Sequence, residues 1–208
     1  TFAFHAAMVN DYLGNTEQAA TYYAEAVAGP GGMTLRVVQL YGNFLERNGR
    51  RDEAVSLYTR MIDQHGGNGM LAPLVLRIAA EDTPVPILES PAEGLAEGLF
   101  SVGTSLRQQG SQDFGLIFGR MALELKPDFV MARLLVADVL ERQDRLEEAN
   151  RVYEGIPADS PFRRSADLNR AQNLSDLDRT DEAVTELERL AADDPDSYDA
   201  LVALGNVL

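Results

Sequence analysis

The chain contains no cysteine and only two histidines. Without cysteine it can form neither a disulfide nor a thiolate nucleophile, and it lacks the sulfur ligands of zinc and iron–sulfur sites. The two histidines are far apart in the sequence, so they do not make a set of metal ligands. Thiol chemistry is therefore excluded, and no metal-binding residues are predicted.

Lysine is scarce, since Lys126 is the single one, and the 18 basic residues are outnumbered by 33 acidic ones. The net charge at pH 7 is −15. Such a surface repels the phosphates of nucleic acids and of anionic membranes, and it attracts basic partners. No apolar run approaches the roughly 18 residues that a membrane-spanning helix needs. We therefore expect no nucleic-acid binding and no direct membrane insertion.

Catalytic motifs are absent as well. The sequence has no Gly-x-Ser-x-Gly elbow and no phosphate-binding Gly-x-x-x-x-Gly-Lys loop. The glycine-rich stretch 29–32 has no lysine after it and no strand before it, so it indicates a break between helices. We predict no catalytic residue and no cofactor, and we expect the chain not to be an enzyme.

A spacing of 34 residues is the strongest pattern in the chain. It separates Pro127, Pro161 and Pro195; Ala149 and Ala183; and Tyr153 and Leu187. Two helical patterns fill each period, which is typical of stacked helix–turn–helix repeats. The sequence therefore predicts an all-α fold, a right-handed superhelical solenoid of antiparallel helix pairs.

The spacing divides the chain into three regions. Residues 1–65 read as two repeats, and residues 96–208 read as three repeats plus the first helix of a fourth. Residues 66–95 are too short for two full helices, so they form either a degenerate repeat or a linker. Within them, Thr83-Pro84-Val85-Pro86 predicts an extended path, because residues before proline avoid the α region.

Small residues recur where the two helices of a repeat should cross. On the first helices they are Gly42, Gly103, Ala137, Ala171 and Gly205, and on the second helices Ala19, Ala54, Gly115, Ala149 and Ala183. Glycine inside a helix costs about 1 kcal/mol relative to alanine. Its use here indicates that the helices approach closely.

These features resemble the tetratricopeptide repeat family over residues 1–65 and 96–208. The resemblance is carried by Leu204-Gly205, Asp52-Glu53-Ala54, Thr180-Asp181-Glu182-Ala183 and Asp194-Pro195. The sequence departs from the family pattern at Arg170, where leucine is usual, and at Gly115, where alanine is usual. The resemblance implies a solenoid that binds a protein or peptide on its concave face.

The same resemblance implies which residues line that face. They are Gln39, Asn43, Phe100, Thr104, Leu134, Asp138, Leu168, Gln172, Val202 and Asn206. Their amides can bond a peptide backbone, and Phe100, Leu134 and Leu168 would offer an apolar strip. Alternatively, the apolar residues pack against the irregular segment or a neighbouring repeat.

Two features bear on the identity of the ligand. These positions lack the basic residues with which chaperone-binding repeats hold a carboxyl terminus, and Asp138 has the wrong charge for that role. The extended stretch from Thr83 to Leu88 is either a surface linker or an internal plug of the groove. The sequence alone leaves both readings open.

The leading functional hypothesis is a protein-interaction scaffold. The alternatives are a non-catalytic arm of a larger enzyme and a module that self-assembles through its terminal repeats. Residues 91–100 and 156–161 also resemble uncharacterised, often exported repeat proteins of alphaproteobacteria, which implies a bacterial periplasm or envelope and leaves the cytoplasm open. Because the chain starts at Thr1 and stops at Leu208 within a helical pattern, we expect a piece of a longer protein.

Overall fold

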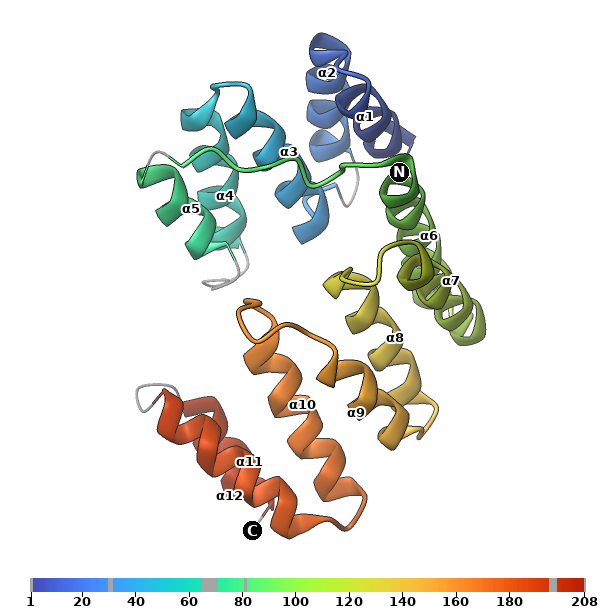
Figure 1. The fold of residues 1–208 in the computed structure, drawn as a ribbon, viewed down its shortest axis with the longest axis vertical. Helices are drawn as coiled ribbons and strands as arrows, with labels where there is room; N and C mark the ends of the chain where they lie inside the picture. Colours follow the sequence, from blue (N-terminus) through green and yellow to red (C-terminus); the bar gives the residue numbers. More distant parts are fainter. Residues whose placement is uncertain (1, 30–31, 65–70, 81, 195–197, 208) are drawn as a thin grey trace. The chain divides into compact units, whose positions relative to one another are not determined.

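The computed structural model describes residues 2–29, 32–64, 71–80, 82–194 and 198–207. Within these ranges the chain forms helices and no β-strand (Figure 1), which confirms the all-α fold class. Contacts divide it into two compact units, unit 1 (residues 1–98) and unit 2 (residues 99–208). Pro195 and Leu208 lie outside the described ranges. The predicted repeat boundaries after residues 65 and 95 stay a prediction.

Unit 1 is built from two helix pairs and a short additional helix. Its helices are α1 (Phe2–Tyr12), α2 (Thr16–Ala28), α3 (Leu35–Arg47), α4 (Arg51–Gln64) and α5 (Ala72–Ala79). The first turns of α6 also belong to this unit. Helices α1 and α2 form one pair, and α3 and α4 form the next (Figure 1).

Aromatic rings fill the space between the two pairs of unit 1. Tyr23 on α2 stacks on Tyr41 of α3 with ring centroids 5.2 Å apart, and its ring lies 5.3 Å from that of Phe44. Helix α5 is attached by Arg77, whose Nη2 donates to Glu46 Oε1 of α3 at 2.7 Å. The unit therefore has one continuous core, and an ion pair attaches α5 to α3.

Unit 2 continues the pattern of helix pairs. Its helices are α6 (Pro91–Gln108), α7 (Gln112–Leu125), α8 (Val130–Arg142), α9 (Leu146–Glu154), α10 (Arg163–Asp176), α11 (Thr180–Asp193) and α12 (Tyr198–Val207). The pairs are α6 with α7, α8 with α9, and α10 with α11. Helix α12 packs on α11 and α10 (Figure 1).

Buried polar side chains connect successive pairs of unit 2. Asn173 Nδ2 on α10 donates to Glu141 Oε1 of α8 and to Asn150 Oδ1 of α9, both at 2.9 Å. Burial raises the pKa of the Glu141 carboxyl. Asn169 Nδ2 also donates to the Tyr153 hydroxyl at 3.0 Å. Of these groups, Asn150 and Asn173 are buried, Glu141 is half-buried and Asn169 is exposed. The bond between the two buried amides satisfies polar atoms that water does not reach.

One turn geometry joins the two helices of each pair. Each turn contains a residue at positive φ: Gly14 (75°), Gly49 (74°), Gly110 (89°), Asp144 (59°) and Asp178 (58°). Glycine enters this left-handed region without a steric penalty, and aspartate tolerates it better than most residues. The same type of turn therefore connects the two helices in each of these pairs.

The predicted close approach of paired helices is confirmed at α6 and α7. A Cβ added to Gly103 would lie 3.1 Å from Phe118 Cβ and 3.4 Å from the carbonyl oxygen of Gly115. The alanines predicted at the crossings are fully buried: Ala19, Ala54, Ala137, Ala149, Ala171 and Ala183. Larger side chains at these positions would force the helices apart.

We expect Gly103→Leu to lower the free energy of unfolding by about 1–3 kcal/mol, because the crossing has no room for the added atoms. The measurement is urea unfolding followed by circular dichroism. Gly205→Leu is the matched control, since a Cβ on Gly205 meets nothing within 4 Å. Equal stability of the Gly103 variant and the control would contradict the close crossing.

Candidate peptide-binding faces

In unit 1, the predicted face residue Asn43 is in contact with the irregular segment. Asn43 is 5% exposed, and its Nδ2 donates to the carbonyl oxygen of Val85 at 2.8 Å. Its Oδ1 accepts from Arg47 Nε at 2.9 Å. The other predicted residue of this unit, Gln39, is half-buried and accepts from Arg36 Nη1 at 3.2 Å.

Residues 82–90, here called the crossing segment, run from α5 across α3 to the start of α6 (Figure 1). Ile87 and Leu88 pack on the core of unit 1, and Thr83 Oγ1 accepts from Arg51 Nη2 at 3.1 Å. The extended path predicted from Thr83-Pro84-Val85-Pro86 is confirmed. The segment therefore lies against Asn43, one of the two predicted face residues of unit 1.

In unit 2, four predicted residues line one pocket with a volume of about 250 Å³. Its lining consists of Phe100, Thr104, Arg107, Met131, Leu134, Leu135 and Asp138. These side chains come from α6 and α8, the first helices of two successive pairs. The pocket therefore combines apolar walls with a few polar groups, which is the usual composition of a ligand site.

The polar groups of this unit 2 pocket are not equally satisfied. Asp138 Oδ2 accepts from Arg107 Nη1 at 2.8 Å, and its Oδ1 accepts from Arg142 Nε at 3.2 Å. The Asp138 charge is thereby compensated. The hydroxyl oxygen of Thr104 is buried and has no hydrogen-bond partner among the described residues. The Phe100 ring is fixed by Phe129, with centroids 5.2 Å apart.

The remaining predicted face residues do not line this pocket. Leu168 is half-buried and packs on the core of α10, α11 and α12. Gln172 is exposed, and its Nε2 donates to Asp176 Oδ1 at 2.8 Å. Val202 and Asn206 are exposed on α12. The assignment of all ten residues to a binding face stays a prediction.

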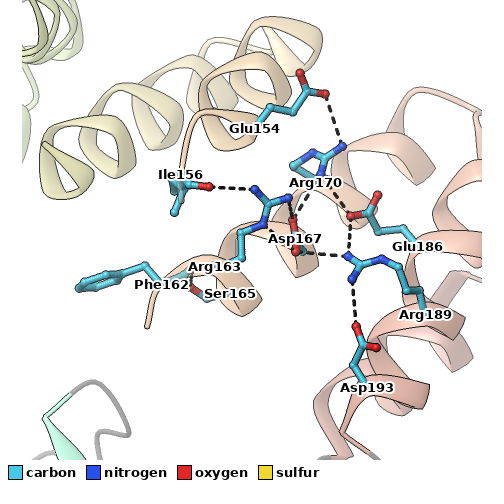
Figure 2. A network of polar contacts seen from close by, with 10 residues as sticks. All are labelled: Glu154, Ile156, Phe162, Arg163, Ser165, Asp167, Arg170, Glu186, Arg189 and Asp193. Atoms are coloured by element: carbon cyan, nitrogen blue, oxygen red, sulfur yellow. Dashed lines mark hydrogen bonds and ion pairs between the residues drawn. The ribbon is translucent and has the colours of Figure 1, made fainter. Parts of the chain in front are cut away.

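Sequence reasoning missed a charged network on α9, α10 and α11, shown in Figure 2. At its centre is Asp167, whose side chain is only 4% exposed. Asp167 pairs with Arg163 (2.8 Å), Arg170 (3.3 Å) and Arg189 (3.3 Å). The one signal in the sequence was Arg170, which stands where the family pattern has leucine.

Acidic partners balance the arginines of this network. Arg170 also contacts Glu154 of α9 and Glu186 of α11, at 3.4 and 3.2 Å. Arg189 Nη1 donates to Asp193 Oδ2 at 3.0 Å. Because each guanidinium has carboxylate partners within the protein, the network connects three helices and is not an open anion site.

Within the described ranges, no group of three or more histidine or acidic side chains could hold a metal ion. No helix in the part of the chain that the structure describes is both long and apolar enough to cross a bilayer. The predicted face residues that contact the irregular segment or line a pocket lie on α3 in unit 1 and on α6 and α8 in unit 2.

Solved structures of repeat proteins are similar to the chain over most of its length. One is YrrB, described as a TPR protein with an unusual peptide-binding site, at 17% identity and a TM-score of 0.47, covering 95% of this chain and 87% of that one. Another is TTC0263, a thermophilic TPR protein of Thermus thermophilus, at 13% identity and a TM-score of 0.45, covering 99% and 96%. No curated protein sequence matches the chain significantly.

The family model of the tetratricopeptide repeat matches residues 168–208. That region contains α11, α12 and most of α10. The earlier helix pairs have the same buried small residues at their crossings and the same positive-φ turns. Residues 168–208 therefore match the tetratricopeptide repeat, and the earlier part of the chain has the same arrangement of paired helices.

Proposed function

We propose that the chain binds an extended peptide of a partner protein in the unit 2 pocket between α6 and α8. Tetratricopeptide repeats form protein-interaction scaffolds, and this proposal assigns the interaction to a particular place. The apolar side chains of Phe100 and Leu134 would hold one aliphatic side chain of the peptide. The hydroxyl of Thr104 would bond the peptide backbone.

The observation that carries the proposal is the equivalence of Thr104 and Asn43. Each lies six residues before the positive-φ glycine that follows its helix, Gly110 and Gly49 respectively. In unit 1, Asn43 bonds a carbonyl of an extended chain, Val85. In unit 2, the buried hydroxyl of Thr104 lacks a hydrogen-bond partner among the described residues. A buried polar atom is normally satisfied, so a bound backbone would complete it.

The chemistry of the partner follows from the pocket and the charge. An apolar wall of this size accommodates one aliphatic side chain, and burying a side chain of that kind contributes about 1.5–3 kcal/mol. The chain carries a net charge of −15, which attracts basic residues and speeds their association. The expected ligand is therefore an extended peptide with an aliphatic centre and basic flanking residues.

Selection of a random phage-displayed peptide library on the full chain tests this proposal. We expect enriched peptides with an aliphatic centre and basic flanks. Fluorescence anisotropy with a labelled selected peptide should then show about tenfold or weaker binding to Phe100→Ala/Leu134→Ala, a loss of about 1.4 kcal/mol or more. Thr104→Val should weaken binding less, since it removes a single hydrogen bond.

Phe114→Ala is the matched control for this experiment. Phe114 is an exposed phenylalanine of the same unit, on α7, and it does not line the pocket. We expect the control to bind the selected peptide as the unchanged chain does. The proposal is wrong if the double variant binds equally well while it keeps its helical circular dichroism.

A further inference from the structure

The crossing segment makes contacts of the kind that a bound peptide would make. Its prolines, Pro84 and Pro86, keep the backbone extended. Asn43 holds the carbonyl of Val85, which lies between them, at 2.8 Å. Ile87 and Leu88 follow and pack on the core of unit 1. One backbone hydrogen bond and two anchored aliphatic side chains are the elements by which grooves recognise extended peptides.

Asn43 is oriented for this contact by a side chain of its own helix. Arg47 Nε donates to Asn43 Oδ1 at 2.9 Å, and Arg47 Nη2 contacts Asp11 Oδ2 of α1 at 2.6 Å. Because the amide oxygen is occupied by Arg47, the amide nitrogen is directed to the segment. The contact to Val85 uses only its backbone, since the Val85 side chain is exposed. An external peptide backbone could therefore make the same bond.

The far end of the segment is fixed by a buried ion pair. Glu97 on α6 is fully buried, and its Oε2 accepts from Arg36 Nε of α3 at 3.0 Å. Arg36 also donates to the predicted face residue Gln39. The segment thus begins after α5, which is anchored to Glu46, and it ends at α6, which is anchored to Arg36. Residues 83–88 lie between these two anchors and belong to neither helix.

We propose that the surface of α3 around Asn43 is a second peptide-binding site, and that residues 83–88 are its intramolecular occupant. The partner it fits is an extended peptide with aliphatic residues beside proline, like the segment itself. Such a peptide binds by displacing the segment, which otherwise occupies the site. The proposal concerns unit 1 and does not depend on ligand binding by unit 2.

The expected size of the effect follows from competition. A tethered ligand acts at an effective concentration of about 1 mM for a short flexible connection. An external ligand of the same chemistry binds only to the fraction of chains whose site is free, so its apparent affinity falls by that fraction. If the segment is docked in more than about nine chains in ten, its release should strengthen external binding at least about tenfold.

The experiment uses the full chain and a fluorescein-labelled peptide with the sequence of residues 82–90. Ile87→Asp/Leu88→Asp releases the segment and leaves Asn43 unchanged. Fluorescence anisotropy should show at least about tenfold tighter binding of the probe to this variant than to the unchanged chain. Adding Asn43→Ala to the released variant should remove most of that gain, because the probe then loses its backbone contact.

Leu13→Asp/Leu76→Asp is the matched control, since it adds the same charge at two exposed leucines of unit 1 outside the segment. It should bind the probe as the unchanged chain does. The proposal is overturned if the released variant keeps its helical circular dichroism and gains no affinity, or if the control gains as much.

A second measurement keeps the proposal testable if the released variant does not fold. Hydrogen exchange of the unchanged chain is followed with and without saturating probe. Displacement predicts faster exchange at the amides of Val85, Ile87 and Leu88, with α8 to α11 unaffected. Unchanged exchange at those amides under saturating probe overturns the proposal.

Discussion

Asp167→Ala is expected to lower the free energy of unfolding of unit 2 by about 3 kcal/mol. The Asp167 carboxylate is nearly inaccessible to water and is the shared partner of Arg163, Arg170 and Arg189 (Figure 2). Alanine would leave three guanidinium groups close together with their central counter-charge removed. Urea unfolding followed by circular dichroism measures the loss.

Two further variants decide whether the loss of stability in Asp167→Ala arises from the burial of its charge or only from the lost ion pairs. Asp193→Ala removes a carboxylate that pairs with Arg189 but is 61% exposed, so it should cost less than about 1 kcal/mol. Arg170→Leu leaves Asp167 with two arginine partners and places the residue that the repeat pattern favours, so its cost should lie below that of Asp167→Ala. Equal costs for Asp167→Ala and Asp193→Ala would contradict a buried central charge.

The helix pairs were predictable because a repeat is a local structure. Ala149 and Ala183 are fully buried on helices that pack against the other helix of their own pair, which immediately precedes them in the chain. The same contact recurs along the chain, so the sequence repeats its requirement for a small side chain there. The repeat spacing was therefore enough to predict the order of the helices and the positions where paired helices cross.

The charged network could not be predicted by the same reasoning. Arg170 was visible as a departure from the family pattern, but its partners Glu154 and Glu186 lie on two other helices. Sequence spacing does not say which of the many acidic residues approaches a given arginine. Such long-range pairing depends on the packing of whole helices, which periodicity does not specify.

The candidate faces were predictable only in part, because equivalent repeat positions have different surroundings. Asn43 contacts the crossing segment, whereas Thr104 lines a pocket. Val202 and Asn206, which the pattern treats alike, are exposed. The family pattern places a residue on a helix, and the neighbouring chain then determines what that residue meets.

Gly42→Ala should lower the free energy of unfolding by about 2 kcal/mol, the net of overpacking and the higher helix propensity of alanine. A Cβ at this position would overlap the ring carbons Cε1 and Cζ of Tyr58. The ring cannot move aside easily, because Tyr58 is fully buried and its hydroxyl donates to Glu46 Oε1 at 2.7 Å. Glu46 in turn is held by Arg77 of α5.

Gly98→Ala is the comparison that separates the effect of overpacking on stability from the effect of helix propensity. Gly98 is also a helical glycine of unit 1, and a Cβ there meets nothing within 4 Å. This variant should be more stable than the unchanged chain by up to about 1 kcal/mol, because only the gain in helix propensity remains. Thermal or urea unfolding should therefore separate the two alanine variants by about 3 kcal/mol. A similar effect of both substitutions would mean that Tyr58 yields readily, and that its bond to Glu46 does not hold the crossing of α3 and α4.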